Sequence, residues 1–172
     1  PGGEDGSLMG HVTRSVMLNG ALALALVLVL ALAWQAARLF RLDLMFTAAA
    51  TEVSFWGRGT YQPDQPVRER IGRELQRLLK ASPAQPDYLT LAASYYSWEA
   101  YRAPSAAVAN EYDGLALDAQ YAAQLSRPAY RQGWEKMIGY ASRIEGAENS
   151  RKLAEQQLIL LDTTTAFAQG SQ

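Results

Sequence analysis

Hydrophobic positions divide the chain into one uninterrupted apolar run and a remainder in which apolar residues recur at helical spacing. The run from Val16 to Ala37 contains no charged residue, and its centre, Ala21 to Trp34, consists only of Ala, Leu, Val and one Trp. A soluble helix would show a polar stripe at the 3.6-residue period, and this run has none. Because about 20 apolar residues span the hydrocarbon core of a bilayer and a helix satisfies its own backbone hydrogen bonds there, the run predicts a transmembrane helix.

The ends of this segment leave one alternative open. We expect a flexible N-terminus over residues 1–15 and a transmembrane helix with an interfacial extension over residues 16–46, where Arg38 and Phe40 suit a membrane–water boundary. A cleaved signal peptide is the alternative, with Ala31-Leu32-Ala33 as its small-residue exit. Apolar residues continue past this exit to Phe46, which favours an uncleaved anchor.

The charges around the anchor give conflicting indications of orientation. Arg14 precedes the segment, whereas Arg38 and Arg41 follow it, and a positive-inside count therefore places the large domain inside the cell. A single early apolar segment followed by a polar domain is instead typical of a signal anchor, which exports the domain. We favour export, partly because of the resemblance described below, and expect a single-pass inner-membrane protein with a periplasmic helical domain.

Residues 47–65 are interpreted as a linker, since two glycines and a proline interrupt regular structure there: Gly57, Gly59 and Pro63. Phe55, Trp56 and Tyr61 are too apolar for an idle linker. We expect these aromatic side chains to dock onto the domain or to lie at the lipid surface, with a partner contact as the alternative.

The remaining chain predicts an all-α domain over residues 66–162, followed by a flexible tail over residues 163–172. Prolines and helix-capping residues separate five amphipathic helices, expected over residues 66–80, 87–102, 106–125, 130–144 and 150–161. In the first of them, Ile71, Leu75 and Leu78 share one face. In the third, the expected inward positions include Tyr112 and Leu115. No alternating stretch indicates a strand.

A weak internal repeat suggests how these helices are arranged. Pro86-Asp87-Tyr88 and Pro128-Ala129-Tyr130 each open a helix, and they lie 42 residues apart (128 − 86). Tetratricopeptide repeats (TPR) have a period of about 34 residues, so the match is partial. Short connections between helices favour antiparallel neighbours. The sequence therefore predicts a small TPR-like array of antiparallel helices behind the anchor.

Composition excludes several kinds of chemistry. The chain has no cysteine and one histidine, His11, which precedes the apolar run. Disulfides, thiol catalysis, histidine triads and Cys- or His-rich metal sites are therefore excluded from the domain, and we expect no cofactor. A net charge of −1 gives no bias toward nucleic acid. We expect a non-enzymatic protein; a glycan-modifying enzyme would have only carboxylates, Tyr or Lys as acid–base groups.

Two surfaces are candidate binding sites. The first predicted helix carries a basic stripe at steps of three or four residues: Arg70, Arg73, Arg77 and Lys80. This stripe could contact anionic lipid headgroups or an acidic glycan, or it could be a solvated face paired with Glu69 and Glu74. In the second helix, Tyr95, Trp98 and Glu99 lie outside the apolar side and are the candidate partner-binding residues. Other aromatic residues are expected to pack in the core, and Glu111, Asp113 and Asp118 are expected to be solvated helix charges.

Three segments suggest a family. TEVSFWGRGTYQP, PDYLTLAASYYSWEAYR and RPAYRQGWEKMIGYASR, together with the short anchor, resemble the small membrane-anchored VpsP-type proteins associated with bacterial exopolysaccharide biosynthesis, over about Met17 to Leu161. The resemblance implies a periplasm-facing TPR-like domain in a polysaccharide assembly system, and it supplies no catalytic residues.

Two functional hypotheses from different classes follow. In the first, the chain is a membrane-anchored, non-enzymatic scaffold or adaptor of an envelope polysaccharide assembly system, and its helical hairpins bind a partner protein. In the second, the chain is an accessory subunit of a respiratory, photosynthetic or secretion complex, held mainly through its transmembrane helix. Small residues on that helix, Gly20, Ala21, Ala23 and Ala25, would allow close helix packing.

Overall fold

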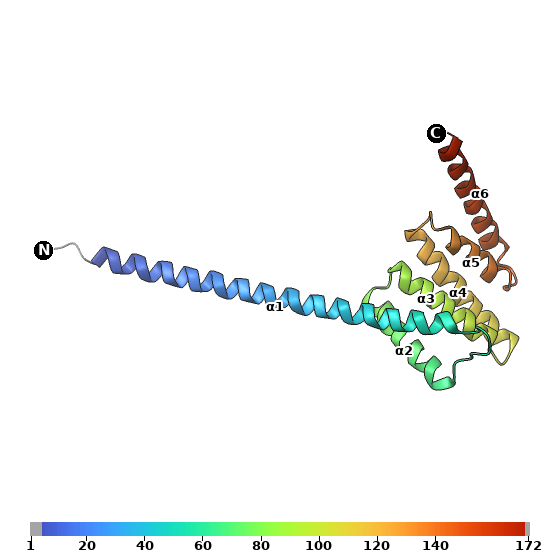
Figure 1. Cartoon of the computed structure of the whole chain (residues 1–172), viewed down its shortest axis with the longest axis horizontal. Coiled ribbons are helices and arrows are strands. Elements are labelled where there is room, and N and C mark those ends of the chain that lie inside the picture. The colour runs from blue at the N-terminus through green and yellow to red at the C-terminus, as the bar shows by residue number, and fades with distance from the viewer. Residues whose placement is uncertain (1–4, 171–172) are drawn as a thin grey trace. The chain divides into compact units, whose positions relative to one another are not determined.

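The computed structural model describes the backbone of residues 5–170 and the side chains of residues 19–163. Within this range every regular element is a helix and there is no strand, which confirms the predicted all-α class (Figure 1). The helices are α1 (Asp5–Phe55), α2 (Gln65–Ala81), α3 (Pro86–Tyr101), α4 (Ala106–Ser126), α5 (Arg131–Ala141) and α6 (Glu148–Gly170). The chain divides into two compact units, residues up to Leu44 and residues from Met45 onward.

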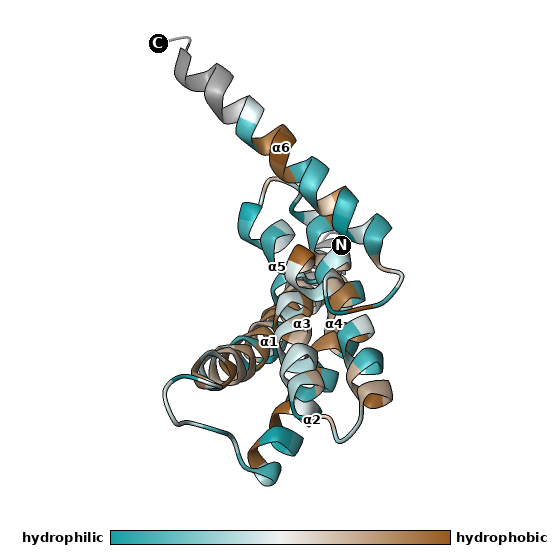
Figure 2. Cartoon of the chain, turned by 90° about the vertical axis from the view of Figure 1, so that its right-hand side faces the viewer, coloured by the Kyte–Doolittle hydropathy of each residue, from teal (hydrophilic) through white to brown (hydrophobic). Residues whose placement is uncertain are grey.

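The first unit is the apolar part of α1. Every described side chain from Asn19 to Arg41 is exposed, including Leu22 at 72% and Trp34 at 68%. Brown, the colour of hydrophobic residues in Figure 2, predominates along α1. By length and composition α1 is able to cross a membrane. An apolar surface of this length needs a cover that the described chain does not provide.

Both ends of the predicted anchor differ from the structure. The N-terminus expected to be flexible is helical from Asp5, and residues 1–4 lie outside the described range. The linker expected over residues 47–65 is helical as far as Phe55, because Thr47 is followed by three alanines and residues 47–55 include no glycine or proline. Ala49 is fully buried. The last turns of α1 therefore belong to the domain, and the irregular connection is confined to residues 56–64.

Glycine conformation explains why α1 ends where it does. Gly57 and Gly59 have φ values of +73° and +58°, in the left-handed region that costs an ordinary L-residue about 1–2 kcal/mol. The Gly57 N–H donates to the Tyr61 carbonyl at 3.1 Å, and the Tyr61 N–H donates to the Arg58 carbonyl at 3.1 Å. These bonds close a tight loop directly after the helix.

Local signals set the start and the buried face of α2. The Asp64 carboxylate caps the helix by accepting a hydrogen bond from the Val67 N–H at 3.0 Å, and Pro66 occupies the first turn. Ile71, Leu75 and Leu78 are fully buried, which confirms the predicted inward face.

Helices α2 to α6 form a consecutive array in which each helix packs against the next one in the chain. The most extensive contact joins α3 to α4, followed by α5 to α6. Such pairs are compatible with TPR-like hairpins, and the TPR-like arrangement stays a prediction. The main core draws its largest side chains from α4 and α5: Leu117, Trp134, Met137 and Tyr140.

The inward face of α4 differs from the prediction. Leu115, expected inside, is 41% exposed, whereas three polar side chains are buried: Asp113, Gln120 and Gln124. Asp113 was expected to be a solvated charge, and this was wrong, because it accepts a hydrogen bond from Nε of Arg143 at 3.0 Å. Alanines occupy much of this helix, so apolar size did not mark its buried side. Glu111 and Asp118 are exposed, as expected.

The C-terminal boundary also differs. A flexible tail was expected over residues 163–172. Helix α6 instead continues through Gly170, and Ser171 and Gln172 lie outside the described range.

Candidate partner-binding site

Trp56, the residue directly after α1, packs against α3. Its side chain is 7% exposed, and its ring lies 5.9 Å from that of Tyr95 and 6.0 Å from that of Trp98, measured between centroids. Tilted aromatic pairs at this spacing add about 0.5–1.5 kcal/mol each beyond their buried area. The expectation that Trp56 docks onto the domain is therefore confirmed. Phe55 and Tyr61 remain 50% and 42% exposed.

Glu52, near the end of α1, holds the loop that follows this helix through two hydrogen bonds. One of its carboxylate oxygens accepts a hydrogen bond from the Trp56 indole N–H at 3.1 Å and another from the Tyr61 hydroxyl. The hydrogen bond to the Glu52 carboxylate is the main reason that the pKa of Tyr61 is raised above its ordinary value. The loop from Trp56 to Tyr61 is thus held by side chains as well as by its own backbone bonds.

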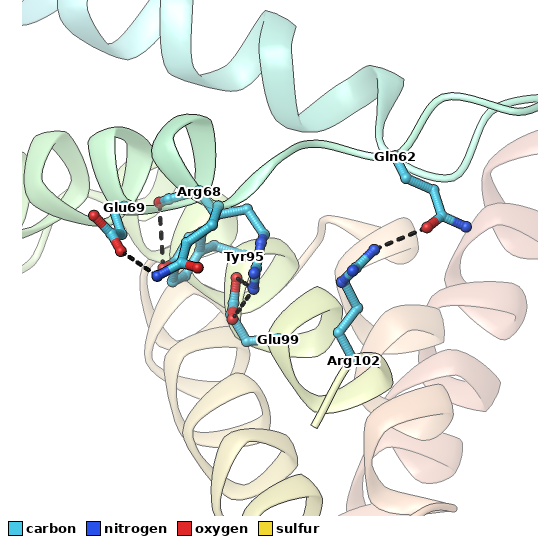
Figure 3. A network of polar contacts seen from close by, with 7 residues as sticks. Gln62, Arg68, Glu69, Tyr95, Glu99 and Arg102 are labelled. Atoms are coloured by element: carbon cyan, nitrogen blue, oxygen red, sulfur yellow. Dashed lines mark hydrogen bonds and ion pairs between the residues drawn. The ribbon is translucent and has the colours of Figure 1, made fainter. Parts of the chain in front are cut away.

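An ion pair joins α2 to α3. Nη1 of Arg68 lies 2.9 Å from Oε2 of Glu99, and their side chains are only 22% and 13% exposed (Figure 3). The Tyr95 hydroxyl lies 3.5 Å from the Arg68 carbonyl oxygen. Gly72 admits this arrangement, because a Cβ atom there would lie 2.8 Å from that hydroxyl oxygen. Truncating either charge would leave its partner half-buried and unpaired.

The structure brings together the three residues predicted to bind a partner. Tyr95 and Glu99 face α2, and Trp98 faces Trp56 and Gly57, so all three contribute to the junction of α1, α2 and α3. They lie outside the apolar side of α3 because residues from other segments contact them: the Trp56 ring packs on Tyr95 and Trp98, and Arg68 of α2 pairs with Glu99. Whether they also contact a partner stays a prediction.

The stability of this junction is expected to fall at alkaline pH. Burial raises the pKa of Tyr95 to about 12, above its ordinary value of 10. The folded state therefore holds the phenolic proton more tightly than the unfolded state, so this contribution is complete below pH 10 and is lost as the pH rises toward 12. We expect the urea midpoint of the protein to fall over this range, and to fall less in Tyr95→Phe. An equal fall in both proteins would contradict the assignment to Tyr95.

The basic stripe of α2 is divided into two halves. Arg70 lies 3.7 Å from Glu74, and Arg73 lies 3.8 Å from Glu69. Exposed pairs at such distances contribute little to stability, and they partly neutralise the first half. Arg77 and Lys80 are exposed, and neither forms an ion pair with the part of the chain that the structure describes. These two cations are the part of the stripe that remains available to an anion.

A groove that the sequence did not reveal lies between the last turns of α1 and α3. It encloses about 380 Å³, and its floor is apolar: Phe46, Ala50 and Val53 from α1, and Leu91 from α3. Its rim carries charged and hydroxyl side chains: Ser54, Arg58, Asp87, Thr90, Ser94 and Lys136. The sequence held a signal for it, since Phe46, Ala50 and Val53 are spaced as one helical face, but this face was divided between the expected anchor and linker.

The charged side chains on the rim differ in whether an opposite charge neutralises them. Asp87 is paired with Arg127, whose Nη1 lies 2.7 Å from its Oδ1. Arg58 lies over the Phe55 ring at 5.6 Å, and Lys136 is exposed and makes no ion pair with a described residue. The groove therefore combines an apolar floor with a cationic rim, which is suited to an amphipathic segment with acidic groups.

Three carboxylates of the domain pair with arginines from other parts of the chain. Glu99 pairs with Arg68, Asp113 with Arg143 and Asp87 with Arg127. Among the residues described, no group of three His, Cys, Asp or Glu side chains is placed to hold a metal ion.

Comparison of the chain with protein-family models, with curated proteins and with solved structures found no match. The resemblance to VpsP-type proteins consequently has no support beyond the quoted segments, and the groove and its surroundings must be interpreted from their own chemistry.

Proposed function

We propose that this chain is a single-pass, membrane-anchored, non-enzymatic adaptor whose helical domain binds a partner protein. The observation that carries the proposal is the groove between α1 and α3. Its volume of about 380 Å³ lies in the range of specific ligand sites, and its floor of Phe46, Val53 and Leu91 matches apolar side chains of a helical or extended segment. Arg58 and Lys136 would select acidic residues flanking that segment.

The anchor and the groove support this function together. Helix α1 carries the apolar segment and also supplies three of the four residues of the groove floor. Restricting the domain to a membrane raises its effective concentration toward a partner in the same membrane, so a weak contact is sufficient. Arg77 and Lys80 on α2 would add a contact with anionic lipid headgroups or with an acidic glycan.

The cellular context of the proposal rests on the resemblance alone. It is an envelope polysaccharide assembly system, with the anchor in the inner membrane and the helical domain in the periplasm. A reporter that is active only outside the cytoplasm, fused after Gln172, tests the orientation. Activity in the membrane fraction is the expected result, and inactivity would place the domain inside the cell.

Site-specific photocrosslinking in intact cells tests the adaptor function. A benzoylphenylalanine at Ser54, on the groove rim, is expected to give a discrete protein adduct, and the same group at Tyr121, on the exposed side of α4, is expected not to give it. Lys136→Glu should weaken the Ser54 adduct several-fold, because it reverses one rim charge. Adducts that are absent, or identical from both positions, would contradict the proposal.

A specific observation keeps the accessory-subunit alternative. Ala21 and Ala25 lie one turn apart on α1, and the described chain covers neither, so a neighbouring transmembrane helix could approach closely there. Replacing residues 19–37 by the same number of leucines distinguishes the adaptor from the accessory subunit. An adaptor retains its Ser54 adduct after this exchange, whereas a subunit held by its transmembrane helix loses its complex.

A further inference from the structure

A second depression lies at the junction, where the loop after α1 meets the end of α3. It encloses about 250 Å³ and is lined by Gly57, Gly59, Tyr61, Gln62, Trp98 and Tyr101. Three aromatic side chains therefore meet in one place, and none of the lining residues is aliphatic. This composition differs from that of the groove, whose floor is largely aliphatic.

Tyr101 is the most exposed aromatic residue here. It ends α3, its side chain is 77% exposed, and its ring lies 5.5 Å from that of Trp98 at an angle of 35°. One side of the ring thus leans on Trp98, while most of its surface faces solvent. Tyr61, on the loop, is 42% exposed. Much of the surface of these two tyrosine side chains is therefore open to a ligand.

Polar groups border these rings. Nη1 of Arg102, the residue after α3, donates a hydrogen bond to Oε1 of Gln62 at 2.9 Å, and the two side chains reach toward each other across the gap between α3 and the loop (Figure 3). The amide group of Gln62 and the remaining N–H groups of Arg102 can donate further hydrogen bonds. No acidic residue lines the depression.

Most of the depression is formed before any ligand arrives. Glu52 holds the Tyr61 hydroxyl, and the Gly57 backbone lies so close to Trp98 that a Cβ at Gly57 would be 2.7 Å from its Cζ3 atom. Tyr101, at 77% exposure, has room to adjust. A ligand would therefore lose little affinity to ordering the protein.

We propose that this depression binds a sugar ring of a glycan. The C–H face of a pyranose carries partial positive charge and stacks on the negative face of an aromatic ring, and its hydroxyls pair with amide and guanidinium groups. An acyl chain or an apolar peptide side chain would instead be suited to an aliphatic floor. The arrangement accepts neutral and uronic sugars, and Arg102 favours the latter. This site goes beyond the adaptor function and does not depend on the groove.

The test measures binding of neutral and uronic oligosaccharides to the full chain in detergent micelles, on an immobilised panel and then by titration of tryptophan fluorescence. At least one oligosaccharide is expected to bind with weak affinity, and Tyr101→Ala should lower that affinity about tenfold. Gln62→Ala should lower it less. Tyr121→Ala, which removes an exposed tyrosine from α4, is the matched control and should bind as the parent does.

The outcomes separate this proposal from the adaptor function. Absence of binding across the panel at millimolar concentration, or equal binding by Tyr101→Ala and Tyr121→Ala, would overturn the glycan site and leave the groove untouched. Loss of the Ser54 adduct in Tyr101→Ala, without any glycan binding, would assign the depression to the protein partner and would also overturn the proposal. Retention of that adduct with loss of glycan binding is the result we expect.

Discussion

Gly133→Ala is expected to destabilise the helical domain by about 1–3 kcal/mol, although alanine is the better helix former. A Cβ at Gly133 would lie 1.9 Å from Oε1 and 2.4 Å from Cδ of Gln124. Gln124 has no room to move aside, since it is fully buried and its Nε2 donates a hydrogen bond to the Tyr130 carbonyl at 2.9 Å. The overlap outweighs the gain in helix propensity, which is at most about 1 kcal/mol. Urea unfolding of the full chain in detergent, followed by circular dichroism, measures the effect.

The same helix supplies a control. Gly139 also lies in α5, and a Cβ there would meet nothing within 4 Å, so Gly139→Ala should leave stability unchanged or raise it by up to about 1 kcal/mol. The double variant Gly133→Ala with Gln124→Ala should be more stable than the sum of the single changes predicts, because shortening residue 124 removes the overlap. A Gly133→Ala protein as stable as Gly139→Ala would show that α4 and α5 do not approach as described.

Trp56→Ala is expected to cost about 3–5 kcal/mol, the range for truncating a large buried aromatic side chain. The change removes the ring that lies between α1 and the Tyr95 and Trp98 rings, and it removes the N–H that donates to Glu52. We expect the loop after α1 to open, with faster amide hydrogen exchange over residues 52–62. Chemical unfolding and hydrogen exchange of the full chain measure the two effects.

Two variants serve as controls for this prediction. Trp56→Phe keeps an aromatic ring in place and loses the hydrogen bond to Glu52, so a smaller cost of about 1–2 kcal/mol is expected. Trp34→Ala removes a tryptophan that is 68% exposed in the apolar part of α1 and should leave unfolding of the domain unchanged. If Trp56→Ala behaved like Trp34→Ala, the end of α1 would not be part of the domain.

The position of Trp56 links stability to both proposed binding sites. Val53 and Arg58 line the groove, and Gly57 and Tyr61 line the aromatic depression, so the segment around Trp56 contributes to both sites. Loosening this segment is expected to weaken both the Ser54 adduct and glycan binding. Tyr101→Ala, in contrast, should affect the glycan alone. The two variants together show whether the sites are separate.

Local features of the sequence determined much of this protein. The apolar run predicts a helix able to cross a membrane because its length and its lack of charge need no information about the rest of the chain. Proline and capping residues placed α2, α3 and α4 within a few residues of their observed bounds. Ile71, Leu75 and Leu78 marked the buried face of α2 because they are large, apolar and spaced by one helical turn.

Only the tertiary structure decided which residues meet across the chain. The partners of Glu99 and Asp113 are 31 and 30 residues away in sequence, and helical spacing cannot indicate contacts at such separations. The polar residue Gln124 is buried because Gly133 lets α5 approach it closely. The identity of either residue in the sequence does not indicate this contact. The last turns of α1 have the composition of a linker, and they belong to the domain because α3 packs beside them. Burial depends on what packs against a residue, so the groove and the aromatic depression became visible only when these helices were placed together.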